Sequence, residues 1–235
     1  MPFILKLRYS DGMKHFILFF LLFTTHLSAF QLQSRLTSAE NGDFIVYVHK
    51  SHCTVMIITK ITDQELVIDE ISAPVFSQLP NWHKWLQDKA PGHTSWTQST
   101  IDRKTSKLIR RISLDDHQVL DHSFEFLPTL MKCPLTPIAQ DERKKVGPEP
   151  QGGEVDHRRI WNPKIIFNGA ECTAKVEGYR ITWPDDASEI SGRVVDIYIP
   201  ENGALTYLPY WIEVYSGPLK FKIFAADSGK KLSTK

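Results

Sequence analysis

Short β-type segments separated by turn signals are the feature that most constrains the fold of this chain. The segments are rich in β-branched residues, which suit a pleated sheet better than a helix. Two pairs of segments flank Asn168-Gly169 and Asn202-Gly203, dipeptides that suit the positive φ angles of tight hairpin turns. Because hairpins join antiparallel strands, the sequence predicts a mainly β protein. We expect its antiparallel curved sheet to form a half-barrel or a barrel.

Residues 77–88 interrupt the strand pattern. Their apolar side chains recur at helical spacing: Leu79, Trp82, Trp85 and Leu86. We therefore expect one short amphipathic helix near 77–88 that crosses the sheet and packs on it through its two tryptophans.

The beginning of the chain has the order of a secretory signal peptide. Lys14 precedes the apolar run 16–23, and a polar exit ends at the small residue Ala29. The run is shorter than the roughly 20 apolar residues of a membrane-spanning helix. We expect residues 1–29 to be a signal peptide, the protein to be exported and periplasmic or secreted, and no permanent transmembrane span. An uncleaved membrane anchor is the alternative.

The composition changes sharply at residues 141–159. A charge run, Asp141–Lys145, is followed by a stretch rich in Gly and Pro, which cannot bury apolar surface. We expect a linker or mobile loop between a β-rich N-terminal part, 30–140, and a β-rich C-terminal part, 160–235. The two parts are expected to form the same sheet, with two separate β-domains as the alternative.

Charge and motifs exclude several classes of function. The 28 basic and 27 acidic residues leave a net charge of +1, without the basic excess of a nucleic-acid-binding protein. No P-loop, dinucleotide fingerprint, nucleophile elbow or zinc-protease motif occurs in the sequence. We expect no nucleic-acid partner and no cofactor, and we assign no catalytic residue. A hydrolase site assembled from scattered residues would draw first on His93, Ser95 and Asp102.

The cysteines do not indicate a metal site. Cys53, Cys133 and Cys172 form no C-x-x-C pair, and His49 and His52 beside Cys53 are fewer than the four ligands of a structural zinc site. We expect no bound metal. One disulfide with one free thiol, or three reduced cysteines, are both compatible with the sequence.

Aromatic side chains are the candidate binding residues. We select Trp96, Trp183, Tyr210 and Trp211. If they line the concave face of a curved sheet, they would form an apolar pocket suited to acyl chains or other hydrophobic ligands. The alternative is that these aromatic residues fill the core between helix and sheet.

Two stretches carry a family resemblance. Trp82-His83-Lys84-Trp85 leads to 90–96, and Leu208–Val214 leads to 227–230. Together they resemble uncharacterised exported proteins of Chlamydiae-like bacteria, a resemblance that implies no activity and no catalytic residues. In architecture alone, an exported β-sheet crossed by a helix is similar to the periplasmic lipoprotein carriers, whose curved half-barrel holds acyl chains.

These observations together predict an exported cell-envelope protein that is not an enzyme. We expect it to bind a lipid or other hydrophobic ligand, or an envelope protein partner, on a face of its sheet. Two alternatives remain at this point: an envelope hydrolase with a histidine-based site, and a structural or host-interaction protein without a small ligand.

Overall fold

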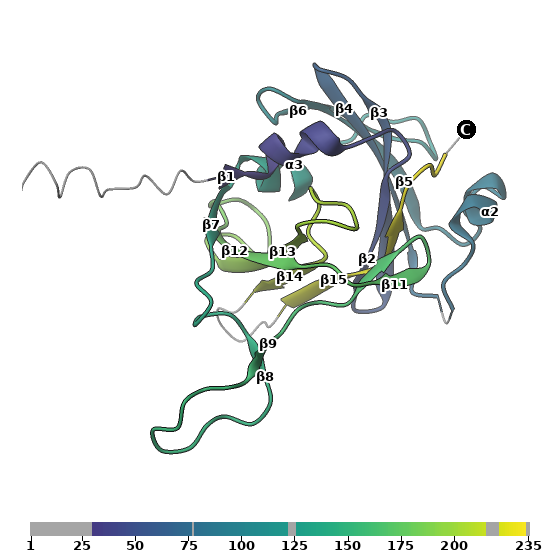
Figure 1. Cartoon of the computed structure of the whole chain (residues 1–235). Coiled ribbons are helices and arrows are strands. Elements are labelled where there is room, and N and C mark those ends of the chain that lie inside the picture. The colour runs from purple at the N-terminus through teal and green to yellow at the C-terminus, as the bar shows by residue number, and fades with distance from the viewer. Residues whose placement is uncertain (1–29, 77, 122–125, 215–220, 234–235) are drawn as a thin grey trace, which may run out of the picture.

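One large antiparallel sheet runs through the protein (Figure 1). The computed structural model describes residues 30–76, 78–121, 126–214 and 221–233, so the predicted signal peptide lies outside the described residues. The strands of the sheet are β1 (Phe30–Gln31), β2 (Phe44–His49), β3 (His52–Ile61), β4 (Glu65–Pro74), β5 (Ser95–Asp102), β6 (Leu108–Ser113), β7 (Pro134–Pro137), β12 (Val176–Thr182), β13 (Val194–Pro200), β14 (Trp211–Val214) and β15 (Phe221–Gly229).

The sheet is open. Its eleven strands follow the order β1-β7-β12-β13-β14-β15-β2-β3-β4-β5-β6, and within the described residues the end strands β1 and β6 do not pair with each other. The predicted mainly β, antiparallel curved sheet is therefore confirmed, and it is not closed into a barrel. Strands from both sides of residues 141–159 take part in it.

Alternation along the strands gives the sheet two buried faces. On β2, Ile45 and Tyr47 belong to one hydrophobic cluster, whereas Phe44, Val46 and Val48 belong to another. Successive side chains of a strand point to opposite faces, so the two clusters lie on opposite sides of the sheet. We call the side of Ile45 the inner face and the side of Val46 the outer face.

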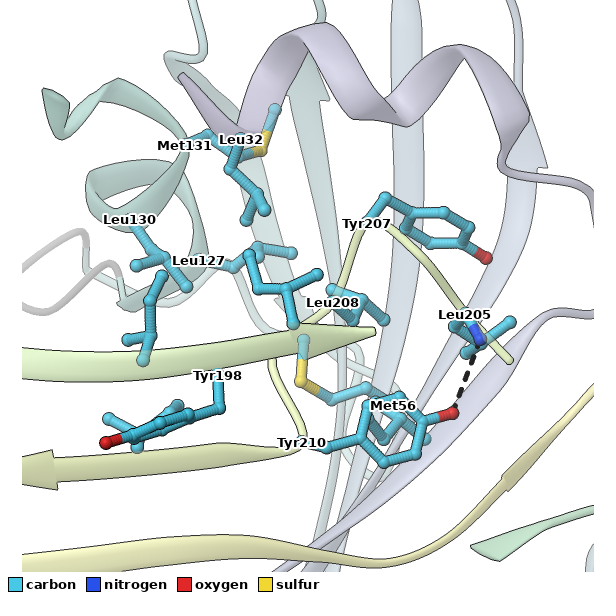
Figure 2. Close-up of a cluster of buried hydrophobic side chains, with 14 of the residues drawn as sticks. Leu32, Met56, Leu127, Leu130, Met131, Tyr198, Leu205, Tyr207, Leu208 and Tyr210 are labelled. Atoms are coloured by element: carbon cyan, nitrogen blue, oxygen red, sulfur yellow. Dashed lines mark hydrogen bonds between the residues drawn. The ribbon is translucent and has the colours of Figure 1, made fainter. Parts of the chain in front are cut away.

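Two short helices cover the inner face, the 3-10 helix η1 (Leu32–Ser38) and α3 (Phe126–Lys132). Their buried side chains point toward the sheet in Figure 2, Leu32 from η1 and Leu127, Leu130 and Met131 from α3. The leucines and methionine of α3 recur at helical spacing. The larger hydrophobic core therefore lies between the inner face of the sheet and these two helices.

Arg35 attaches η1 to the sheet. Its guanidinium donates to the carboxylate of Glu177 and, at 2.6 Å, to the hydroxyl of Tyr179, both on β12. It also lies over the Tyr179 ring, 5.4 Å from the ring centroid. Charge-assisted hydrogen bonds of this kind fix the orientation of the helix that covers the core.

The outer face of β2–β4 is covered by α2 (Trp82–Gln87). Asn81 caps this helix, because its side chain accepts a hydrogen bond from Lys84 N at 3.1 Å. Trp82 and Trp85 are buried on the sheet as expected. Leu79, which we placed on the apolar helical face, instead precedes the helix and is 48% exposed.

A small hairpin lies beside the C-terminal strand. It pairs β10 (Ile165–Phe167) with β11 (Ala170–Cys172). The turn is Asn168-Gly169, and both residues have positive φ angles, 52° and 74°, as predicted from the dipeptide. Gly169 N donates to Asp227 Oδ1 at 3.2 Å, which joins the turn to β15.

Residues 141–159 contribute to a projecting hairpin. β8 (Lys145–Val146) pairs with β9 (Arg159–Ile160), and the loop between them extends away from the body of the protein (Figure 1). Arg158 and Lys145 hold the pKa of the Asp156 carboxyl well below its usual range through hydrogen bonds. These contacts tie the two sides of the hairpin together.

The base of this hairpin packs on the outer face of β12–β14. Trp161 makes edge-to-face contacts with Tyr198 and Trp211, at centroid distances of 5.3 and 4.9 Å. Arg143 donates to Val176 O at 2.9 Å and to Asn162 Oδ1 at 3.0 Å. The segment thus has a folded base as well as an exposed loop.

Candidate functional site

A cavity of about 480 Å³ opens on the inner face, beside α3. Its walls come from β2, the β2–β3 turn, β3, β4, β15 and the first residue of α3. The lining residues are Tyr47, His49, Lys50, Ser51, His52, Thr54, Met56, Glu70, Phe126 and Ile223. Small-molecule sites typically measure about 300–1,000 Å³, so the cavity has the size of a ligand pocket. We refer to it as the inner pocket.

The register of three strands places the pocket residues together. Tyr47 pairs with Thr54, and Met56 pairs with Glu70. Because side chains two positions apart share a face, Thr54 and Met56 both point to the inner side. The pocket thus follows directly from strand alternation.

The apolar part of the inner pocket is formed by Met56, Phe126 and Ile223. Phe126 is held in place by Trp183, whose ring stacks on it at 5.4 Å with an interplanar angle of 17°. Trp183 is itself buried and donates from Nε1 to Asp186 Oδ2 at 2.8 Å. One wall of the pocket is therefore supported from the core.

Among the lining residues that the structure describes, Glu70 carries a carboxylate. Arg111 Nη2 on β6 donates to Glu70 Oε2 at 3.2 Å. Burial raises the pKa of the Glu70 carboxyl, and the positive charge of Arg111 partly offsets this effect. A carboxylate kept in a partly desolvated pocket by one arginine is a strong acceptor for a further donor.

The other end of the pocket is the β2–β3 turn. Lys50 has a φ of 53°, and the turn also contributes His49, Ser51 and His52 to the lining. His49 Nδ1 lies 2.9 Å from the carbonyl oxygen of Lys222 on β15. The mouth at this turn therefore carries Lys50 and two imidazoles.

Tyr47 lines the pocket between the β2–β3 turn and Glu70. Its hydroxyl donates to Pro209 O at 2.9 Å, and burial raises the pKa of this phenol well above its usual value. The phenol is therefore neutral at physiological pH and occupied by a structural hydrogen bond.

The four aromatic residues selected from the sequence do not lie together. Tyr210 is fully buried, and its hydroxyl contacts Ser228 and, at 3.4 Å, Leu205 N (Figure 2). Trp96 lies on the outer face and donates from Nε1 to Asp69 Oδ2 at 3.2 Å.

Trp211 lies on the outer face as well, between Trp161 and Phe224. Its Nε1 donates to Glu213 Oε2 at 3.1 Å, and Lys144 and Lys222 lie over its ring. Of the four residues, Trp183 reaches the inner pocket, indirectly through Phe126.

The residues of the suggested hydrolase site are also separated. His93 Nε2 lies 2.8 Å from Asp115 Oδ1, so Asp115 and not Asp102 is its carboxylate partner. Asp102, at the other end of β5, accepts hydrogen bonds from Thr105 and from Lys104 N. Its carboxylate stabilises a turn.

Three further observations concern the described part of the chain. No group of three or more His, Cys, Asp or Glu side chains there is arranged to hold a metal ion. Cys53, Cys133 and Cys172 are free thiols. None of the helices described there is long and apolar enough to cross a membrane.

None of the residues that line the inner pocket was among the aromatic candidates selected from the sequence. Tyr47, Thr54, Met56 and Glu70 share a face by simple alternation, and this signal is visible in the sequence. Which face is concave depends on the curvature of the sheet and on α3, whose first residue is Phe126.

Comparison with known proteins places the chain in a family. A family model described as CT021 protein matches residues 54–173, just over half of the 235-residue chain. The chain belongs to the CT021 protein family. The matched residues include β4, β5 and all of β3 except its first two residues, and with them the Glu70 wall of the inner pocket.

A solved structure from the CT021 group has the same fold. It is that of the hypothetical protein CT021 from Chlamydia trachomatis, with a TM-score of 0.58 and 16% sequence identity over 87% of this chain and 94% of that chain. No curated protein matches the sequence. The expected resemblance to uncharacterised proteins of Chlamydiae-like bacteria is confirmed by these findings.

Proposed function

We propose that this protein is a non-catalytic, exported protein of the cell envelope that binds a small hydrophobic ligand in the inner pocket. One observation carries the proposal, the cavity of about 480 Å³ with an apolar wall of Met56, Phe126 and Ile223. Apolar pockets with a few convergent polar groups are typical of ligand sites. The apolar run 16–23 supports the export part of the proposal.

The test is to fill the pocket and measure binding of a simple hydrophobic probe. Thr54 lines the pocket and its hydroxyl lies 3.3 Å from Ser72 Oγ. Thr54→Phe places a ring in the cavity and keeps a residue that favours strands. Isothermal titration with dodecanoic acid should show binding to the wild-type protein. The affinity of the variant should be at least about tenfold lower, because the new ring takes the place of apolar probe surface whose burial contributes more than about 1.4 kcal/mol.

Thr100→Phe is the matched control. Thr100 lies on β5 and is half-buried like Thr54, but it does not line the inner pocket. This variant should bind the probe as the wild type does. Unchanged binding by Thr54→Phe, or no binding by the wild-type protein, would overturn the proposal. If the proposal holds, native mass spectrometry of the protein purified gently from its cells identifies the ligand as an added mass.

A further inference from the structure

The two ends of the inner pocket differ in charge, and this difference constrains the ligand. Lys50 and the two imidazoles lie at the β2–β3 turn, whereas Glu70 lies further along the sheet, opposite Met56. From Ser51 to Met56 the chain advances five residues, which corresponds to about 16 Å at roughly 3.3 Å per strand residue. A ligand that touches both ends is therefore elongated.

Apolar residues accompany the polar ones along this length, with Met56 opposite Glu70 and Ile223 next to the register pair Phe224–Val48 near the turn. Met56, Phe126 and Ile223 offer no charged group and no strong hydrogen-bonding group. Burying apolar surface there stabilises a complex in proportion to the area removed from water. The middle of the ligand should therefore be aliphatic.

Glu70 selects the group at the far end. Its Oε2 is taken by Arg111, and Oε1 has no hydrogen-bond partner among the residues that the structure describes. The Glu70–Arg111 pair has no net charge, so a neutral donor can bind Oε1 without placing an unbalanced charge in the pocket. An ammonium group would leave one positive charge in excess at a partly desolvated site.

Lys50 selects the group at the near end. It is the lysine among the described lining residues, and it is exposed at the β2–β3 turn. An anionic group there gains charge-assisted contacts and keeps its access to water.

We infer that the ligand of the inner pocket is an aliphatic chain with an anionic group at the Lys50 end and a hydroxyl that donates to Glu70. This inference rests on the proposed function and deepens it. Glu70 then determines specificity, because a chain without the hydroxyl leaves the carboxylate without this donor.

The experiment compares dodecanoic acid with ω-hydroxydodecanoic acid by isothermal titration. The wild-type protein should bind the hydroxy acid about tenfold more tightly, the effect of one hydrogen bond to a charged acceptor. Equal binding of the two acids overturns the inference and leaves the proposed function intact. No binding of either acid overturns both.

Paired variants connect the preference to Glu70. The double variant Glu70→Met, Arg111→Met removes the ion pair without leaving a lone charge, a change that proteins usually tolerate. It should bind both acids equally. The control Lys60→Met, Glu65→Met removes an ion pair between β3 and β4, with a 3.0 Å contact, that does not line the pocket. It should keep the tenfold preference, and a preference that persists in the Glu70 variant would contradict the inference.

Lys50→Gln tests the anionic end. This variant should weaken the binding of both acids by a similar factor and leave the ratio between them unchanged. If it changes neither affinity, the assignment of the anionic group to Lys50 is wrong. Circular dichroism of every variant checks that the fold is retained.

Discussion

The hydrogen bond between Trp82 and Asp227 should be a main attachment of α2 to the sheet. Trp82 Nε1 donates to Asp227 Oδ2 at 2.8 Å, and both residues are buried, with 5% of each exposed. Asp227 also accepts from Gly169 N and from Ser228 N. Its carboxylate therefore joins α2, the β10–β11 turn and β15.

The cost of Trp82→Phe can be worked out from these contacts. Loss of a hydrogen bond to a charged, buried acceptor costs about 1.5–3 kcal/mol. The smaller ring also weakens the edge-to-face contacts with Phe76 and Trp85, at 5.9 and 5.7 Å, by about 1 kcal/mol in total. We expect a decrease of about 3 kcal/mol in the free energy of unfolding. In a chain of this size that decrease corresponds to a Tm lower by about 6–12 °C.

Trp85→Phe is the comparison that tests the reasoning. Trp85 is on the same helix and equally buried, but its Nε1 donates to a neutral acceptor, Pro91 O, at 3.1 Å. A neutral hydrogen bond contributes about 1 kcal/mol, so this variant should lose about 2 kcal/mol with its ring contacts included. Thermal and urea denaturation followed by circular dichroism give both values. If the two variants are equally destabilised, the charged acceptor adds nothing and the argument fails.

Two further changes test other parts of the fold. A Cβ at Gly42, where φ is +88°, would lie 2.8 Å from Lys231 Cα, so Gly42→Ala should cost at least about 2 kcal/mol in urea denaturation. Gly92→Ala, at φ +80° with open space around it, should cost clearly less, and equal losses would refute the steric explanation. The hydrogen bond to Asp115 raises the pKa of His93, so the stability that it contributes is present below about pH 6.5 and is lost as the pH rises through the folded-state pKa. His93→Gln should therefore lower the free energy of unfolding at about pH 5, by less than about 1 kcal/mol because Asp115 is largely solvent-exposed. At about pH 9 the substitution should have little effect. Chemical denaturation at the two pH values measures both effects.

Local signals in the sequence predicted much of the sheet. The turn at Asn168-Gly169 followed from the dipeptide, and β2, β3 and β4 followed from their β-branched residues. Asn202-Gly203 was less informative, since β14 begins only at Trp211 and a longer connection precedes it.

The helix α3 begins at the end of a segment whose local pattern is typical of a strand. Leu120, His122, Phe124 and Phe126 alternate with polar residues, a pattern that predicts a strand over 119–126. Phe126 instead begins α3, Val119 makes an isolated bridge with Ile112, and residues 122–125 lie outside the described part of the chain. The spacing of Leu127, Leu130 and Met131 is the signal that would have corrected this interpretation.

The inner pocket depends on the arrangement of the whole sheet. Alternation shows that Thr54 and Met56 share a face, but not that Ile223, far away in the sequence, lies beside them. That contact exists because β15 pairs with β2. Aromatic content was a poor guide to the pocket. Tyr210 and Trp183 are buried in the core, where the Tyr210 hydroxyl contacts Ser228 and Trp183 Nε1 donates to the exposed Asp186.

The position of β15 has a consequence for how the protein folds. This strand is synthesised after all the others, yet it lies inside the sheet between β14 and β2. Until it joins the sheet, β14 and β2 each present a row of unpaired backbone N–H and C=O groups to other chains. The eleven-stranded sheet is therefore complete only when residues 221–229 join two separate sets of strands, and the edges of both sets are open to aggregation until then.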